Sequence, residues 1–180
     1  MKRFVLSVVT LLTISFSLQA QDYRPIEWDI LRLGYVSPSA EGIGSGISFS
    51  TEPRFNINNN ISTSIKMEFA YFALDHIFSC GDLGAVVSYV LIGDYYFLNE
   101  SNKRAFAGFG IGTYSGIAIS AYREGACAKG GAIDRSSGVV SRLGFKLGII
   151  RVTGEYNILL AEEANNYLGI HLGFTIGGRR

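Results

Sequence analysis

The residues in this sequence that could do chemistry are a sparse set of charged side chains, two histidines and two cysteines. The charged ones lie inside otherwise apolar or small-residue stretches, and with one histidine they form this set: Arg32, Lys66, Glu68, Asp94, Arg142, Lys146, Glu155 and His171. Both signs are present, which predicts internal ion pairs, because charges withdrawn from water persist only when they are paired. A gated or very narrow conduit for small solutes is the functional alternative.

No catalytic, metal or nucleotide site is recognisable in the sequence. His76 and His171 have no Cys or carboxylate cluster beside them that would complete a metal site. Hydrolysis by a Ser-His-acid group needs all three within reach, and no serine stands in a GxSxG turn. Gly108, Gly110 and Gly112 recur at every second position of a strand and not before a helix, so we expect them to leave lumen space for long side chains. The sequence predicts no cofactor, no metal and no enzymatic activity.

Cys80 and Cys127 are the only cysteines in the chain. Both fall in predicted loops on the same side of the fold. An even number of cysteines in an exported protein favours a disulfide, which would tie two loops together. Two unpaired thiols are the alternative, because the strand pattern does not show whether the two Cα atoms come within bonding range.

The first twenty residues have the organisation of a secretory signal peptide. Lys2 and Arg3 precede an apolar run over 4–18, and Ala20 is the predicted cleavage point. A permanent anchor is the alternative, but hydroxyl side chains interrupt the run and it is shorter than the ~20 residues of a bilayer crossing. We therefore expect a signal peptide over 1–20 and one domain over 21–180.

The charge balance argues against a nucleic-acid partner. Cleavage would remove two of the 16 basic residues and none of the 15 acidic ones, which changes the formal net charge from +1 to −1. A nucleic-acid surface needs a basic patch. After residue 20 no segment has the pattern of a transmembrane helix, so a membrane role would have to rest on strands.

The elements that position the charges are strands, because apolar and polar residues alternate with period 2. In the segment 87–97, Tyr89 and Leu91 share one face and Asp94 lies on the other. In the segment 27–36, the alternation places Ile30 on the same face as Arg32. Eight such strands are predicted, over 27–36, 43–55, 61–71, 87–97, 105–114, 138–149, 151–159 and 167–177.

The connections favour a barrel. Short turns are predicted near Asn58, Asn102 and Ile150, and generally longer loops near Ser37, Ile77, Ala126 and Glu163. An even number of antiparallel strands with short turns at one end is typical of bacterial outer-membrane proteins, and eight strands enclose an interior filled by side chains. The predicted fold class is an all-β, eight-stranded, antiparallel, up-and-down transmembrane β-barrel, with its turns in the periplasm and its loops outside the cell.

The apolar face of the barrel could point either inward or outward. A secreted, lipocalin-like binder would keep its apolar face inside, whereas a membrane barrel turns it toward lipid. The polar faces carry mostly Gly, Ser and Thr with few charges, and a surface in bulk water would be densely charged. Aromatic residues near the predicted strand ends are expected at the membrane interfaces, although strands favour Tyr in any case; they are Tyr71, Phe72, Tyr95, Tyr96, Phe97, Tyr114, Tyr156 and Tyr167.

The sequence also resembles a family. The segments GDYYF (93–97), AGFGIGTY (107–114) and YLGIHLGFTIGG (167–178), behind a signal peptide, are similar to the small outer-membrane barrels grouped with OmpX, OmpW and the OmpA barrel, particularly those of Bacteroidetes. The resemblance covers the whole mature chain and carries no catalytic signature. Many proteobacterial members end in a Phe read by the assembly machinery, whereas this chain continues past Phe174 to Arg180.

Together these features predict a non-enzymatic protein of the bacterial outer membrane that acts in surface interaction or envelope integrity through its extracellular loops. The first alternative is a narrow channel for small or hydrophobic molecules, as the likeness to OmpW allows, and the second is the lipocalin-like binder. The expected partners are outer-membrane lipid, the β-barrel assembly machinery, and an extracellular ligand or host surface. A monomer is expected.

Overall fold

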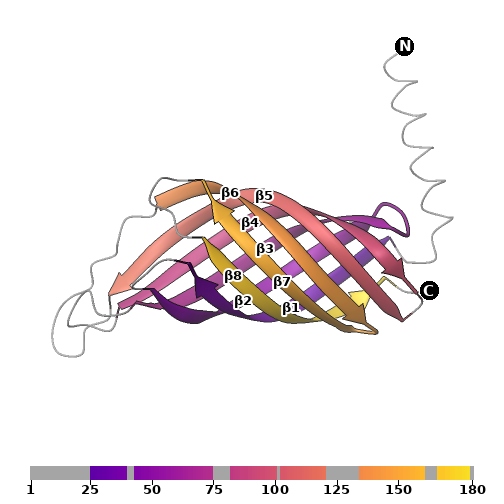
Figure 1. Cartoon of the computed structure of the whole chain (residues 1–180), viewed down its shortest axis with the longest axis horizontal. Helices are drawn as coiled ribbons and strands as arrows, with labels where there is room; N and C mark the ends of the chain where they lie inside the picture. Colours follow the sequence, from indigo (N-terminus) through magenta and orange to yellow (C-terminus); the bar gives the residue numbers. More distant parts are fainter. Residues whose placement is uncertain are drawn as a thin grey trace, which may run out of the picture.

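The computed structural model describes residues 25–39, 43–74, 82–100, 102–120, 134–160 and 166–178. Eight antiparallel strands close into one barrel, in which β1 also pairs with β8 (Figure 1). They are β1 (Ile26–Pro38), β2 (Ile43–Asn56), β3 (Ile61–Leu74), β4 (Asp82–Asn99), β5 (Lys103–Ser120), β6 (Asp134–Leu147), β7 (Ile150–Leu159) and β8 (Tyr167–Gly177). The predicted all-β barrel is confirmed.

Three sequence predictions fall outside the described residues. They are the signal peptide over 1–20, the pair Cys80 and Cys127, and the longer loops near Ile77, Ala126 and Glu163. All three stay predictions. Among the described residues, none belongs to a helix with the length and apolar character of a membrane span.

Short turns join the strand pairs at one end of the barrel, where they were expected. In the β2–β3 turn, Asn58 Oδ1 accepts hydrogen bonds from the backbone N–H groups of Asn60 (2.8 Å) and Ile61 (2.7 Å), which is the local bonding that makes Asn a turn residue. The β6–β7 turn contains Gly148 at φ +59°, a left-handed conformation that favours glycine.

β4 and β5 are longer than the sequence pattern indicates. β4 begins at Asp82 and not at Val87, and β5 continues to Ser120 beyond Tyr114. The added segments are rich in Gly, Ala and Ser, which have weak strand preferences, so the sequence pattern does not indicate strands there. They form because the two strands pair continuously from Asp82↔Ser120 to the turn, with a single register shift. Tertiary pairing has overridden local propensity here.

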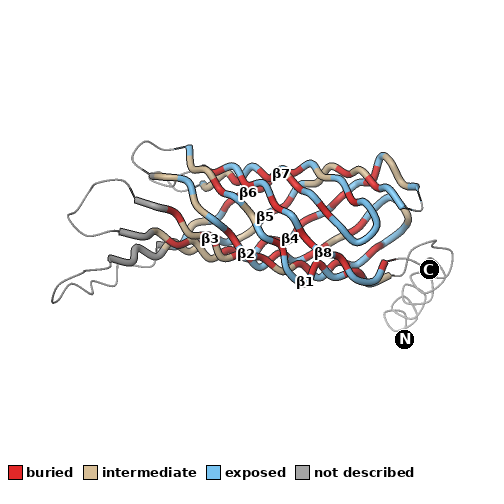
Figure 2. Tube along the Cα trace, turned by 90° about the horizontal axis from the view of Figure 1, so that it is seen from below, coloured by how far each residue is buried: buried red, intermediate tan, exposed pale blue. Residues whose placement is uncertain are grey.

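The alternation separates an apolar outside from a polar inside. Figure 2 shows buried and exposed residues alternating along the strands. Large apolar side chains are exposed on the outer surface of all eight strands, such as Leu33, Ile65, Leu91 and Ile111, while the inward positions include thirteen charged residues. The lipocalin-like alternative is therefore wrong for this barrel, because its interior is not the apolar pocket that such a binder needs.

The face predicted for Ile30 is wrong. The register of β1 against both β2 and β8 shifts just after Asp29. A β-bulge adds one unpaired residue and resets the alternation. Ile30 and Leu31 are consequently both exposed, at 48% and 47%, whereas Asp29 and Arg32 both point inside.

Four of the aromatic residues expected at the membrane interfaces lie inside the barrel instead. Each is almost fully buried: Phe72, Tyr96, Tyr114 and Tyr167. Tyr71, Tyr95, Phe97 and Tyr156 do face outward. The prediction used position near a strand end and ignored the alternation, which in β4 already put Tyr96 on the same face as Asp94.

Candidate functional site

The candidate site is the lumen of the barrel, which is lined by charge. Six acidic and seven basic side chains of the described residues are buried there: Glu27, Asp29, Glu52, Glu68, Asp94 and Glu155 with Arg32, Arg54, Lys66, Arg104, Arg142, Lys146 and Arg151. They come from β1 to β7, and His171 and Thr175 of β8 join them through polar contacts. Every strand therefore contributes to one polar cluster, which we call the lumen network.

Arg142 of β6 lies at the centre of this network. Its guanidinium donates two hydrogen bonds to Glu52 of β2, both 2.8 Å, and two to Asp94 of β4, at 2.8 and 2.7 Å. All three side chains are at most 1% exposed. Bidentate Arg–carboxylate pairs are the strongest form of ion pair in proteins because geometry and charge act together. Arg142 ties three separate strands across the lumen.

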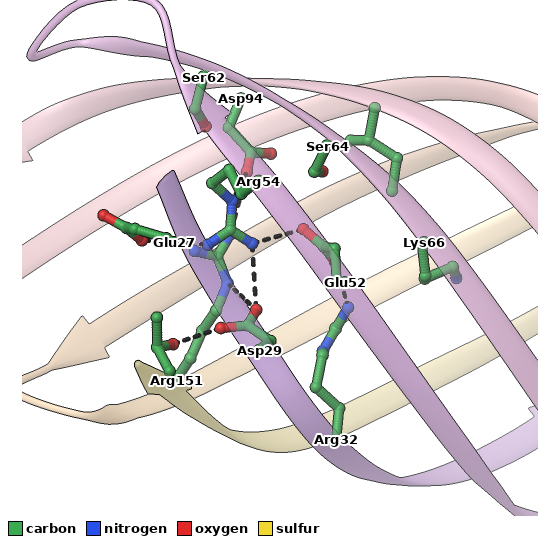
Figure 3. A network of polar contacts seen from close by, with 12 residues as sticks. Glu27, Asp29, Arg32, Glu52, Arg54, Ser62, Ser64, Lys66, Asp94 and Arg151 are labelled. Atoms are coloured by element: carbon green, nitrogen blue, oxygen red, sulfur yellow. Dashed lines mark hydrogen bonds and ion pairs between the residues drawn. The ribbon is translucent and has the colours of Figure 1, made fainter. Parts of the chain in front are cut away.

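Toward the turns, Glu27 and Arg54 organise the network. Glu27 lies 2.6 Å from Arg104, 3.1 Å from Lys146 and 3.3 Å from Arg54. Arg54 reaches Asp29 at 3.1 Å and also pairs with Glu52 (Figure 3). Thr175 donates a hydrogen bond to Asp29 from the last strand.

Toward the loops, Glu155 of β7 is the shared acceptor. It binds Arg32 at 2.5 Å and Lys66 at 2.6 Å, and Arg32 also lies 2.6 Å from Glu52. Lys66 contacts Glu68 at 2.6 Å as well. Through Glu52 and Arg32, this group connects without interruption to the cluster around Arg142.

All eight residues of the set predicted from sequence point into the lumen. The structure brings Arg32, Lys66, Glu68 and Glu155 together, and it pairs Arg142 with Asp94. Lys146 does not join them and pairs with Glu27. His171 Nε2 lies 3.8 Å from Glu68 Oε2.

Sequence reasoning missed six members of the network, namely Glu27, Asp29, Glu52, Arg54, Arg104 and Arg151. The alternation that places Ser48 and Ser50 inward continues at Glu52 and Arg54, because the strand runs on past Pro53. Arg104 lies just outside the predicted strand 105–114, on the face of Phe106, and Arg151 is the first residue of the predicted strand 151–159. For these four residues the alternation itself was the available signal.

Two arginines of the network also stack on aromatic rings. The guanidinium carbon of Arg104 lies 3.5 Å from the ring centre of Tyr96, and that of Arg151 lies 3.7 Å from that of Phe106. Tyr96 and Phe106 are themselves neighbours, with ring centres 5.5 Å apart. Cation–π contacts of this kind stabilise most when water is excluded.

An apolar layer lies inside the barrel on the loop side of the network. Its buried members are Val36, Ala70, Phe72, Val90, Ile92, Tyr114, Val140 and Tyr167. The two tyrosines direct their hydroxyls to polar partners, since Tyr114 donates to Asn157 at 3.0 Å and Tyr167 donates to Glu68 at 3.3 Å. The apolar layer therefore borders the charged part of the interior, and both of its tyrosine hydroxyls have a hydrogen-bond acceptor there.

Inward glycines make room for these side chains. A Cβ on Gly173 would lie 2.6 Å from Arg32 Cγ, and one on Gly144 would overlap the ring of Phe106. At Gly108 it would overlap the Asp94 carboxylate. Large inward side chains therefore occupy the space beside inward glycines, and the interior is packed at these positions.

His171 has more neighbours than the sequence indicated. Ligand atoms of Glu68, Glu155 and His171 all lie within 4.8 Å of one another, so the prediction of no carboxylate cluster near this histidine is wrong. It failed because three strands distant in sequence meet inside the barrel. Lys66 Nζ, 2.6 Å from both carboxylates, already supplies the positive charge that a metal ion would bring.

The same place contains a serine, a histidine and an acid without the geometry of a hydrolase. Ser48 Oγ is 3.0 Å from His171 Nε2, and Glu68 approaches that same nitrogen. A Ser-His-acid relay needs the serine and the acid on opposite ring nitrogens. His171 Nδ1 has no hydrogen-bond partner among the described residues, so the arrangement supports a packing contact and not nucleophile activation.

A closed eight-stranded barrel with an apolar outside and a charged, filled inside is the architecture of small outer-membrane β-barrel proteins. Neisserial surface protein A has a similar crystal structure, with a TM-score of 0.60 over 86% of this chain and 98% of that one, at 11% sequence identity. So low an identity establishes the shared fold alone. No protein-family model matches the chain, and no curated protein sequence matches it significantly.

Two further crystal structures show weaker similarity. The N-terminal barrel domain of Pseudomonas aeruginosa OprF matches with a TM-score of 0.47 at 12% identity, over 87% of this chain and 98% of that one. Ail, the attachment invasion locus protein of Yersinia pestis, matches with 0.48 at 11% identity, over 87% and 99%. Both scores are below 0.5, so they support no inference about this chain.

Proposed function

We propose that this chain is a non-enzymatic outer-membrane barrel with a closed lumen, which acts in surface interaction or envelope integrity through its loop end. The filled interior carries this proposal. The lumen network crosses the barrel from wall to wall, and the apolar layer lies above it. A conducting pore would need a continuous water path, and eight-stranded barrels leave no wide one.

Membrane insertion is supported by the outer surface. Along β4, the outward residues from Phe97 to Tyr89 extend over roughly 27 Å of strand, or about 20 Å along the axis of a barrel whose strands tilt by ~40°. This is close to the ~25 Å apolar band of outer-membrane barrels. Export would follow removal of residues 1–20 after Ala20, and a monomer fits because each described strand pairs on both sides.

Cell fractionation with electrophoresis of heated and unheated samples tests the membrane placement. We expect the protein in the outer-membrane fraction, with a heat-dependent change in mobility that reports a folded barrel. A soluble protein without that change would overturn the proposal.

Planar-bilayer recording tests the closed lumen, with a large porin as the positive control. We expect no stable conductance steps from this chain. Conductance steps that change size in an Arg142→Lys variant would come from the lumen and would favour the narrow channel instead. Arg135→Lys is the matched control, because Arg135 lies on the outer surface.

Orientation is tested by treating intact cells with trypsin. The segment 121–133 contains Arg123 and Lys129, and the proposed orientation exposes it to the medium. We expect cleavage there in intact cells. Cleavage only after permeabilisation of the outer membrane would mean that the loops face the periplasm and would refute a surface role.

A further inference from the structure

A groove lined by hydroxyl side chains and one guanidinium lies on the outer surface near the loop ends of β4, β5 and β6. Its volume is about 370 Å³, and it is lined by Tyr89, Thr113, Ser115, Arg135, Ser136 and Ser137. The register explains how these residues meet. Thr113 lies between Tyr89 and Ser137 in neighbouring strands, and Ser115 lies opposite Arg135. Three adjacent strands therefore present hydroxyl groups and one guanidinium on the same outward patch, which we call the β4–β6 groove.

The next row of outward residues toward the turns is entirely apolar. Ile111 lies between Leu91 of β4 and Val139 of β6, and both Leu91 and Ile111 are well exposed on the outer surface. A groove that offers hydroxyl and guanidinium groups directly above an apolar row matches an amphiphile, with its headgroup in the groove and an acyl chain along the strands below. Tyr89 lies between the two regions, as tyrosines do at membrane interfaces.

Arg135 is exceptional among the charged residues of the strands. Of the charged strand residues whose exposure is described, only Lys103 and Arg135 are exposed, and Lys103 lies at the turn end. Among the carboxylates whose side chains the structure describes, none lies within ion-pair distance of Arg135, unlike the carboxylate partners of the cations in the lumen network. A cation on the outer wall is costly near the membrane midplane but tolerated at the interface. Its planar donor groups suit a phosphate.

We propose that the β4–β6 groove binds the phosphate-bearing headgroup of an anionic membrane lipid on the loop side of the bilayer. Arg135 pairs with the phosphate, the hydroxyls of Thr113, Ser115 and Ser137 donate hydrogen bonds to its remaining oxygens, and an acyl chain follows Leu91 and Ile111. The site deepens the surface role proposed above and rests on the barrel being inserted in a membrane.

Fluorescence quenching by brominated lipids tests this. The chain has a single tryptophan, Trp28, which lies near the turn end of β1 and donates a hydrogen bond to Thr51. A reporter chain carries Trp28→Phe and Leu91→Trp, so that its indole lies just below the groove. The full chain is folded into phosphatidylcholine vesicles that contain a minor fraction of either brominated phosphatidic acid or brominated phosphatidylcholine.

We expect brominated phosphatidic acid to be enriched at the reporter indole about tenfold over brominated phosphatidylcholine, the effect of one charge-assisted pair. The native chain, quenched at Trp28, provides the control position and shows little preference. Arg135→Gln in the reporter chain reduces the enrichment to about twofold or less, and Arg135→Lys keeps only part of it, because the charge remains but the planar fork of donors is lost. Heat-dependent mobility verifies that each variant is folded.

Equal quenching by the two brominated lipids at the reporter indole would overturn the headgroup site and leave the membrane placement standing. An enrichment that survives Arg135→Gln would also overturn it, since the phosphate would then bind elsewhere. A folded chain quenched by neither lipid at either position would overturn the membrane placement itself. The failure of the site and the failure of the proposed function therefore give different results.

Discussion

Replacing Arg142 by Met tests whether the lumen network holds the barrel together. Met is close to Arg in length but carries neither charge nor donors, so the variant removes four charge-assisted hydrogen bonds and leaves little empty space. The two bonds to Glu52 and the two to Asp94 are lost together. No other described side chain contacts both of these carboxylates in a bidentate manner.

The expected magnitude follows from the partners that remain. Glu52 keeps Arg32 and Arg54, and Asp94 keeps Arg151 at 3.0 Å. Neither carboxylate is stranded, so the cost lies at the lower end of the range for breaking a buried pair, about 3 kcal/mol. With a urea dependence of about 2 kcal/mol per molar, the unfolding midpoint falls by about 1.5 M.

Urea unfolding of the purified chain in vesicles of phosphatidylcholine alone, which offer the β4–β6 groove no anionic lipid, measures this change. The fluorescence of Trp28 and the heat-dependent mobility report the folded fraction independently. Arg135→Met is the matched control, because it removes the same groups from the outer surface and should shift the free energy of unfolding by less than about 0.5 kcal/mol. A double-mutant cycle with Asp94→Asn should return a coupling energy of about 1 to 3 kcal/mol.

The reasoning is refuted if Arg142→Met lowers the midpoint no more than Arg135→Met does. That result would mean that water or local repacking replaces the lost pairs at no cost, and that stability comes from backbone pairing and the apolar surface alone. A coupling energy near zero would refute the direct bond between Arg142 and Asp94 in particular.

Three further outcomes are expected. The added methyl of Gly144→Ala would overlap Phe106, so this variant should lower the free energy of unfolding in urea by about 1 to 3 kcal/mol. Gly93→Ala is the control and should be near neutral, because nothing lies within 4 Å of its added Cβ. Equal losses of stability in the two variants would contradict a packed lumen. Phe109→Arg puts a charge on the outer wall and should cost about 2–4 kcal/mol in the same assay, which a water-exposed wall would not show. Peptide mapping without reductant should recover Cys80 linked to Cys127, and two alkylated thiols would contradict the disulfide.

Most of the fold could be predicted from the sequence because the alternation is regular. Ser62, Ser64, Lys66 and Glu68 share one face of β3 in the sequence pattern and in the structure. A period-2 pattern fixes which face a residue occupies as long as the strand has no bulge. That condition holds for β3, which pairs with β4 without any register shift.

The rest could not be predicted because it depends on which strands meet across the lumen. In β1, the bulge after Asp29 changes the face of Ile30, and nothing in the alternation shows it. The pairing of Arg32 with Glu155 joins positions 123 residues apart, a distance that strand patterns do not address. Tyr96 illustrates a third reason, since an amphipathic ring suits both a membrane interface and a lumen with a polar partner.

The distribution of the lumen network over all eight strands has a consequence for assembly. A sheet that lacks its last strand has neither the β1–β8 pairing nor the contacts of Thr175 with Asp29 and of His171 with Glu68. Charges of early strands have partners on late ones, so a half-formed wall holds unmatched ions that favour water over lipid. Partly formed barrels in the bilayer are therefore high in free energy. Insertion should proceed as a single concerted event in which β1 pairs with β8 and the charged side chains of the lumen network form their ion pairs at the same time.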